Sequence, residues 1–258
     1  MSHPIQCEFP PGYDGTALIE RLEHVLDPEL DESILRLGFI RSLKVYDGHA
    51  TVYVQLPTSW CAANFAYLMA ADIRCALLTV DGIHQVTVCL GEHFAAEAIE
   101  TAVNTGKSFA EVFPGEGCGS LTALRRTFLH KGFTRRQERL LRELRAAGVS
   151  PEDICTLRIA DVGVLEDACV LLRIGHAPIR LGPAEILSHY LTRRAESGLD
   201  CAPTAPLITD LQGQPLGGER LEAYYHVART VRVALEANGS FCRAVLAVRQ
   251  PNSSECSP

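Results

Sequence analysis

The chain has 258 residues, of which 47% are hydrophobic and 21% are charged, so it can fill one large core or two of ordinary size. No apolar run approaches the roughly 18 residues that a membrane-spanning helix needs, which argues against a membrane protein. The net charge of −7 is uneven, because residues 1–119 hold 6 Lys and Arg against 16 Asp and Glu, whereas residues 120–250 hold 18 against 14. This asymmetry predicts two units with different surfaces.

The N-terminal sequence and the cysteines indicate a reducing compartment. Residues 1–4 lack the basic stretch and apolar segment of a signal peptide, so we expect a cytoplasmic location. The ten cysteines are scattered and include no C-x-x-C pair, which is the pattern neither of a zinc ribbon nor of a thioredoxin-type site. Most of them should be free thiols that pack as small hydrophobic groups.

The first module, residues 1–113, has the hydrophobic patterns of a mixed α/β unit. Asp14 or Thr16 can cap the first helix, and Pro28 is expected to stop it. Asp47-Gly48 lies between two alternating runs and is typical of a tight hairpin. We predict the order helix, strand, strand, helix, strand, helix over residues 18–26, 43–45, 52–56, 65–80, 86–90 and 94–103.

A Gly-rich linker at residues 114–120, which includes Cys118, is expected to separate this module from a mainly helical one at residues 121–249. Thr134 and Gln137 form a capping-box pattern, and Ser150-Pro151 is typical of a helix start. We predict strands at residues 169–174 and 177–181 and helices at residues 183–191 and 219–239. A disordered tail is expected at residues 250–258.

Cys61 follows the second predicted strand in the segment Leu56-Pro57-Thr58-Ser59-Trp60-Cys61. If Thr58 caps the next helix, Cys61 occupies its third position, where free N–H groups and the helix dipole favour a thiolate. Cys61 would then be a better metal ligand and nucleophile than an ordinary cysteine. An inert, packed cysteine remains the alternative.

A second candidate feature is the pair of carboxylates Asp27 and Glu29, which flank Pro28 at the predicted end of the first helix. A proline makes such a turn rigid, so the two side chains would project from a fixed position. Taken alone, the motif is more typical of a solvated turn than of a binding site.

Together these features resemble a known family. The residues that carry the resemblance are Asp27-Pro28-Glu29-Leu30, Ser33-Ile34-Leu35-Arg36-Leu37-Gly38-Phe39-Ile40, the Asp-Gly hairpin, Thr58-x-x-Cys61 and Gly82-Ile83-x-x-Val86-x-Val88. This ordered set is similar to the small iron–sulfur cluster assembly domain of the PaaD and SufT type over residues 16–92. The resemblance implies an α+β fold and a role in maturing iron–sulfur or other iron proteins.

The resemblance also implies a site. It makes Cys61 the functional residue with Thr58 beside it, and it brings Asp27 and Glu29 as further candidate ligands. The family commonly has proline after this cysteine, whereas Ala62 stands here. One thiolate cannot hold a cluster, which normally takes four cysteine ligands. A transiently bound iron or cluster would therefore need a second copy in a homodimer, ligands from a partner, or Asp27 and Glu29.

The second module resembles the catalytic domain of tyrosine recombinases. The residues that carry this resemblance are Phe133-Thr134, residues 148–154 and 157–162, Pro206-Leu207-Ile208 and Gly213-Gln214-Pro215-Leu216. Ser150 occupies the position of the family's first catalytic arginine, and no tyrosine follows Tyr225 to act as nucleophile. The resemblance thus implies an inactive relative that now serves as a docking surface.

These patterns favour a non-enzymatic accessory factor for iron–sulfur or iron-enzyme maturation. The client would be an iron enzyme such as a multicomponent oxygenase, since PaaD-type proteins serve such systems. No phosphate-binding loop, G-x-S-x-G or H-E-x-x-H motif indicates an enzyme. The alternative is a DNA-binding regulator built on the recombinase-like module, whose opening segment is basic. Glu138 and Glu143 interrupt that segment, and the first module is acidic, so nucleic-acid binding is disfavoured.

Overall fold

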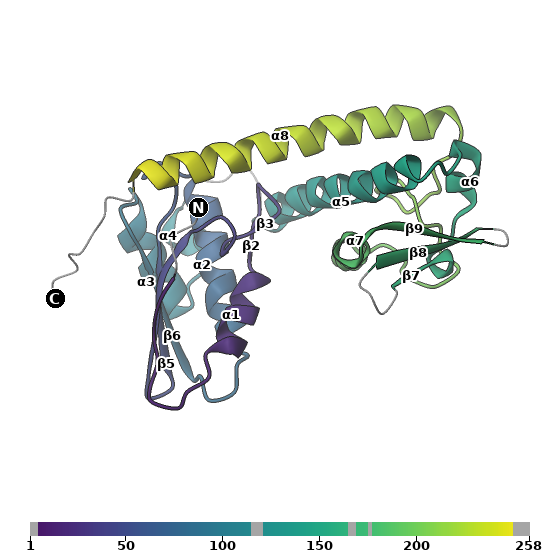
Figure 1. Ribbon diagram of the computed structural model, residues 1–258. Helices are drawn as coiled ribbons and strands as arrows, with labels where there is room; N and C mark the ends of the chain where they lie inside the picture. The colour runs from purple at the N-terminus through teal and green to yellow at the C-terminus, as the bar shows by residue number, and fades with distance from the viewer. Residues whose placement is uncertain (1–4, 115–120, 165–168, 175–176, 250–258) are drawn as a thin grey trace. The chain divides into compact units, whose positions relative to one another are not determined.

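The computed structural model describes residues 5–114, 121–164, 169–174 and 177–249 (Figure 1). The chain divides into two compact units, the first formed by Met1–Leu124 with Leu235–Pro258 and the second by Arg125–Ala234. This division differs from the predicted one because the end of the last helix groups with the first unit. Apart from Pro114, the predicted linker lies outside the described residues, as do Cys118 and the tail at 250–258.

The first unit is an α+β fold on a mixed four-stranded sheet with the strand order β1-β4-β5-β6. Strands β4 and β5 are antiparallel, whereas β1 runs parallel to β4 and β6 parallel to β5. Its elements are β1 (Gln6–Glu8), α1 (Thr16–Glu23), β2 (Leu26–Asp27), β3 (Glu32–Ser33), β4 (Ile40–Tyr46), β5 (His49–Val54), α2 (Ala63–Leu77), β6 (Gln85–Leu90), α3 (Ala96–Thr105) and α4 (Phe109–Val112). The expected α+β fold is confirmed. The predicted helices and strands follow one another in the expected order, but β1, the β2–β3 pair and α4 were not predicted.

Local sequence explains the central hairpin of the sheet. Asp47 and Gly48 both have positive φ, 48° and 69°, as a two-residue turn between twisted strands requires. Along β5, Ala50, Val52 and Val54 are buried and alternate with more exposed residues, so one face of the sheet covers the core. Helices α2 and α3 pack against β6 and complete that core.

The first helix ends earlier than predicted. Its last residue is Glu23 rather than a residue next to Pro28, because Leu26–Asp27 pairs with Glu32–Ser33 as a small antiparallel hairpin. The N-cap of this helix is Gly15, so the predicted cap at Asp14 or Thr16 is wrong, although the Asp14 carboxylate accepts a hydrogen bond from the main-chain N–H of Thr16 at 2.9 Å. The hairpin places residues 27–32 in a tight turn.

The second unit combines helices with the three-stranded antiparallel sheet β7-β8-β9. The elements that lie wholly or mostly in it are α5 (Leu121–Ala146), α6 (Pro151–Thr156), a 3-10 helix (Ile159–Asp161), β7 (Val162–Val164), β8 (Cys169–Ile174), β9 (Ala177–Pro183), α7 (Ala184–Glu196) and α8 (Glu219–Arg249). Ser150 caps α6 as predicted, since its side chain accepts a hydrogen bond from the N–H of Asp153.

The predicted capping box at Thr134 and Gln137 is wrong, because α5 runs without a break through both residues. The Thr134 hydroxyl donates to the carbonyl oxygen of His130 one turn earlier, at 2.9 Å. Gln137 is buried, and its amide donates to the carbonyl oxygen of Thr209 at 2.7 Å. Thr134 and Gln137 have the three-residue spacing of a capping box, but in this helix both side chains make hydrogen bonds elsewhere.

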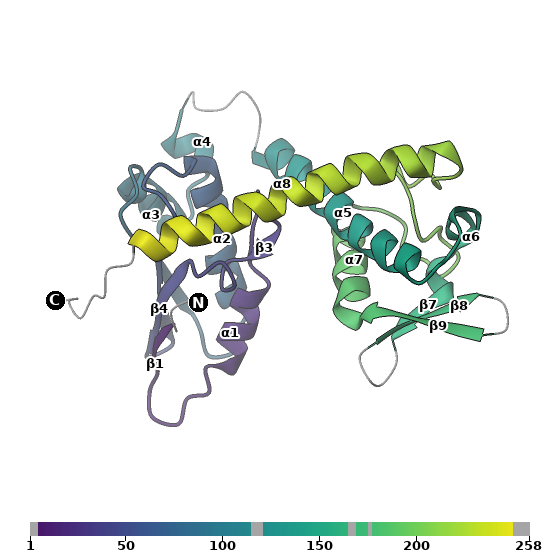
Figure 2. The same cartoon turned by 45° about the horizontal axis from the view of Figure 1, so that its top comes forward.

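The last helix was also predicted too short. Helix α8 continues past Asn238-Gly239 to Arg249, and its final turns, yellow in Figures 1 and 2, belong to the first unit. Glycine weakens a helix but does not necessarily end it, and here tertiary contacts of the following residues outweigh that cost. Among the described residues, no helix has the length and apolar character needed to cross a membrane.

Candidate functional site

The candidate site lies at one edge of the mixed sheet. Because β5 and β6 are parallel, both end at this edge, and the loops that follow them lie side by side. The N–H of Gly91 donates to the carbonyl oxygen of Val54 at 2.7 Å, and the N–H of Phe94 donates to that of Ser59 at 3.0 Å. These bonds tie the loop that carries Cys61 to the loop after β6.

Cys61 precedes its helix instead of occupying its third position, so the predicted placement is wrong. Helix α2 begins at Ala63, and Ala62 is an extended N-cap with no side-chain hydrogen bond. The N–H of Cys61 is directed at the carbonyl oxygen of Thr58, at 3.4 Å, which closes a turn before the helix starts. The free amides of the first helical turn therefore begin beyond Cys61.

Thr58 and His93 fix the position of Cys61. The Thr58 hydroxyl oxygen lies 3.4 Å from the Cys61 Sγ, close enough for a hydrogen bond in either direction. Nε2 of His93 donates to the carbonyl oxygen of Cys61 at 2.8 Å, while its Nδ1 accepts from the N–H of Ala95 at 3.2 Å. Both ring nitrogens are thus used, and His93, only 9% exposed, positions the loop.

Sequence reasoning missed His93. The available signal was its place three residues after the end of β6, because a parallel neighbour strand ends at the same edge as β5. The same relationship explains why a residue so distant in sequence from Cys61 contacts its main chain.

The two predicted carboxylates have different surroundings. Asp27 is 7% exposed and accepts a hydrogen bond from the N–H of Leu30 at 2.8 Å, whereas Glu29 is exposed. The pKa of Asp27 is raised to about 6, mainly by burial and also by the nearby charges of Glu29 and Glu32, against the opposing effect of main-chain hydrogen bonds. The solvated-turn interpretation fits Glu29 and does not fit Asp27.

The structure adds a second thiol that sequence reasoning missed. Cys242 on α8 is partly buried and packs against the same hydrophobic core as Cys61. Burial raises the pKa of the Cys242 thiol to about 11, and the negative charges of Asp27, Cys61 and Glu29 contribute in the same direction. Cys242 is therefore within electrostatic reach of all three predicted ligands. Because the helix was predicted to end at Gly239, Cys242 was not expected to lie on it.

The described residues of one chain do not form a complete metal site. In the described part of the chain, no three or more His, Cys, Asp or Glu side chains are grouped so that they could hold a metal ion. Cys75, on α2, is exposed and has no place in the site. The thiols at the site can supply some of the ligands of a soft or borderline ion, with the rest from elsewhere.

Two aromatic rings extend the surface beside Cys61. Trp60 and Phe94 stack with their centroids 5.7 Å apart and an interplanar angle of 18°. Trp60 is 78% exposed and Phe94 is 54% exposed, so the stack presents apolar surface to the solvent. Exposed aromatic pairs of this kind are characteristic of binding surfaces.

Comparison with known families gives a match within the first unit. Residues 16–89 match the family described as iron-sulfur cluster assembly protein. The matched segment contains Asp27, Glu29, Thr58 and Cys61 but ends before His93 and Cys242. The match supports an iron–sulfur assembly domain in the first unit and a role in iron–sulfur cluster assembly. No curated protein and no solved structure matches the chain.

Proposed function

We propose that this protein is a non-enzymatic accessory factor that binds iron or an iron–sulfur unit as cargo through Cys61 and passes it to a client protein. The observation that carries the proposal is the placement of Cys61. It is partly exposed, and it lies in a loop whose main chain is tied to His93, inside the segment that matches the assembly family.

The chemistry of the loop suits temporary binding. A thiolate is the usual protein ligand of iron–sulfur clusters. The Thr58 hydroxyl lies within hydrogen-bond distance of the Cys61 sulfur and can help to orient it. Few protein ligands leave coordination positions for a client, so cargo bound at Cys61 can be transferred rather than kept.

The type of client and the cellular setting are inferred from the sequence. The resemblance to the PaaD and SufT type supports an iron-enzyme client such as a multicomponent oxygenase, and a cytoplasmic setting. A homodimer that pairs two Cys61 thiols remains an alternative source of ligands.

We propose a docking role for the second unit. Several of its arginines are engaged within it: Arg232 pairs with the buried Glu138 at 2.6 Å, Arg145 pairs with Glu222 at 2.8 Å, and Arg194 is fully buried. Arginines used in this way contribute little to phosphate binding, which favours a protein partner over DNA.

The deciding experiment is Cys61→Ala in cells of the source organism, with Cys75→Ala as the matched control on an exposed cysteine of the same unit. We expect Cys61→Ala to lower both the iron content and the activity of at least one iron enzyme, and Cys75→Ala to lower neither. Normal iron content and activity of every iron enzyme in the Cys61→Ala strain would refute the proposed function.

A further inference from the structure

The end of α8 packs one face against the first unit. Gly239, Cys242, Leu246 and Arg249 are spaced by three, four and three residues and therefore lie on one side of the helix. Leu246 is 3% exposed and belongs to the core of the unit, and Cys242 packs against that core. The Cys242 side chain therefore faces the domain that carries Cys61.

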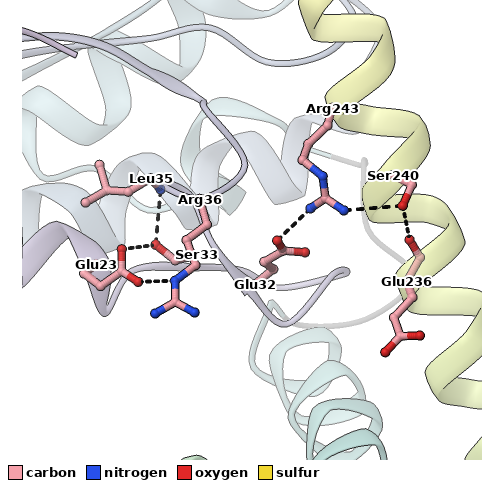
Figure 3. A network of polar contacts seen from close by, with 8 residues as sticks. All are labelled: Glu23, Glu32, Ser33, Leu35, Arg36, Glu236, Ser240 and Arg243. Atoms are coloured by element: carbon pink, nitrogen blue, oxygen red, sulfur yellow. Dashed lines mark hydrogen bonds and ion pairs between the residues drawn. The ribbon is translucent and has the colours of Figure 1, made fainter. Parts of the chain in front are cut away.

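The first contact that holds this segment is made to the β2–β3 hairpin. Arg243 donates to the Glu32 carboxylate at 2.6 Å and to the Ser240 hydroxyl at 3.4 Å (Figure 3). Gly239 permits this approach, since a Cβ at its position would lie 3.2 Å from a Glu32 carboxylate oxygen. Glu32 is the cross-strand partner of Asp27 in this hairpin. The helix is therefore held to the hairpin that carries the buried Asp27 carboxyl group.

The second contact is made to the two loops at the sheet edge. Arg249 donates to the carbonyl oxygens of Leu56 and Pro57, at 3.3 and 3.0 Å, and pairs with Glu92 at 2.9 Å. Leu56 and Pro57 directly precede Thr58, and Glu92 directly precedes His93. Cys242 thus belongs to a helix segment that is anchored, through Arg243 and Arg249, to the β2–β3 hairpin and to the loops of the Cys61 site.

We propose that Cys242 is a second cargo ligand, so that Cys61 and Cys242 together form a two-thiolate site for a divalent, borderline-soft metal ion such as Fe²⁺. This inference depends on the proposed function of Cys61. Binding converts two thiols and one M²⁺ into a bis-thiolate complex and releases two protons to the solvent.

This arrangement addresses the shortage of ligands within one chain. Two thiolates from one protein hold an ion more firmly than one, and they still leave positions open for a client. The second thiol comes from α8, outside the family-matched residues 16–89, so it is a feature of this chain rather than of the matched domain.

The test is a Co²⁺ titration of the reduced full-length protein without oxygen, followed by thiolate-to-cobalt charge-transfer absorption. We expect Cys61→Ser and Cys242→Ser each to lose about half of the absorption per bound Co²⁺ and to weaken binding at least about tenfold, as for loss of a metal-site residue. Cys75→Ser should match the wild type. Wild-type absorption and affinity in Cys242→Ser would overturn the inference, as would the absence of a thiolate band in the wild type.

Two further experiments distinguish the loss of a metal ligand from misfolding, and this inference from the proposed function. Cys242→Ala replaces the cysteine with alanine, which favours a helix. A far-ultraviolet circular dichroism spectrum like that of the wild type would exclude misfolding as the cause of lost binding. In cells, Cys242→Ala should lower iron loading of the client as Cys61→Ala does. Loss with Cys61→Ala but not with Cys242→Ala would overturn only this inference, whereas normal loading in both would overturn the proposed function as well.

Discussion

The imidazole of His93 donates a hydrogen bond from Nε2 to the main-chain carbonyl oxygen of Cys61, with 2.8 Å between nitrogen and oxygen. The bond links the loops after β5 and β6, and the ring itself is almost fully buried. A buried acceptor that loses its donor keeps its desolvation cost, so this bond matters more for the conformation of the Cys61 loop than its single contact suggests.

We therefore expect His93→Ala to lower the free energy of local opening of residues 58–62 by about 1–3 kcal/mol. Amide hydrogen exchange measured by mass spectrometry would report this as faster exchange in that segment. His93→Gln, whose amide can donate to the same carbonyl, should restore part of the protection. His84→Ala, at an exposed histidine, serves as the control, and unchanged exchange in His93→Ala would contradict a positioning role.

Asp27 predicts a pH dependence of stability in the metal-free protein. Its pKa is raised from 3.8 to about 6, so the folded state binds more protons than the unfolded state between these values. The free energy of unfolding should therefore fall as the pH rises through this window, by about 3 kcal/mol at most. Asp27→Asn keeps an acceptor for the N–H of Leu30 and removes the titration.

Denaturant unfolding of the wild type and Asp27→Asn at pH 4 and pH 7 would test this. The variant should be the more stable protein at pH 7, with a smaller advantage at pH 4. Asp14→Asn is a control of opposite sign, because the hydrogen bonds that the Asp14 carboxylate accepts from Thr16 lower its pKa, and their contribution to stability is lost as the pH falls. Equal pH dependence in the wild type and Asp27→Asn would contradict the assignment.

The parts of the fold that were predictable from sequence are those set by local chemistry. Asp47-Gly48 favours a hairpin because both residues tolerate positive φ, and the alternation along β5 follows from one buried face. Cys61 was misplaced because the Thr58 hydroxyl lies against the Cys61 sulfur instead of capping a helix. The sequence does not distinguish a Thr58 that caps a helix from a Thr58 that contacts the Cys61 sulfur, because the two residues are three positions apart in both arrangements.

Cys242 could not be placed by local patterns, since its proximity to Cys61 depends on contacts between segments far apart in the chain. Gly239 appeared to end the helix, but its missing side chain instead permits close approach to Glu32. The overlooked signal was the helical spacing from Gly239 through Cys242 to Leu246, which continues one apolar face beyond the glycine. Even that pattern does not identify the surface against which the face packs.

Arg249 should hold the end of α8 against the two loops at the edge of the sheet. Arg249→Met keeps much of the aliphatic stem but removes the hydrogen bonds to Leu56 and Pro57 and the ion pair with Glu92. We expect alkylation of Cys242 by iodoacetamide, mapped by mass spectrometry, to become about tenfold faster. Arg36→Met, which removes an exposed ion pair with Glu23, should leave the rate unchanged, and equal rates in all three proteins would show that the segment does not depend on Arg249.

Thr58 should act on the sulfur rather than on the helix. Thr58→Val is nearly isosteric and removes the hydroxyl that lies 3.4 Å from the Cys61 Sγ. Residues that orient a metal ligand typically contribute about 10–100-fold to metal affinity, so we expect Thr58→Val to weaken Co²⁺ binding by about tenfold or more. Ser59→Ala is the neighbouring control. Unchanged Co²⁺ affinity in Thr58→Val, with native circular dichroism, would mean that the hydroxyl does not position the sulfur.

The stacked rings of Trp60 and Phe94 should contribute to client contact without contributing to metal binding. Their exposed apolar surface lies next to the thiol that a client must approach, and aromatic residues in such positions often contribute 1–2 kcal/mol or more to binding, which is about tenfold in affinity. We expect Trp60→Ala to lower iron loading of the client in cells while Co²⁺ affinity in vitro stays at the wild-type value. Tyr46→Ala is the matched control, because Tyr46 is 84% exposed but lies beside the Asp47-Gly48 turn at the opposite edge of the sheet. Equal client loading in Trp60→Ala and Tyr46→Ala would remove the rings from the docking surface, whereas a parallel loss of Co²⁺ affinity in Trp60→Ala would assign them to the shape of the metal site instead.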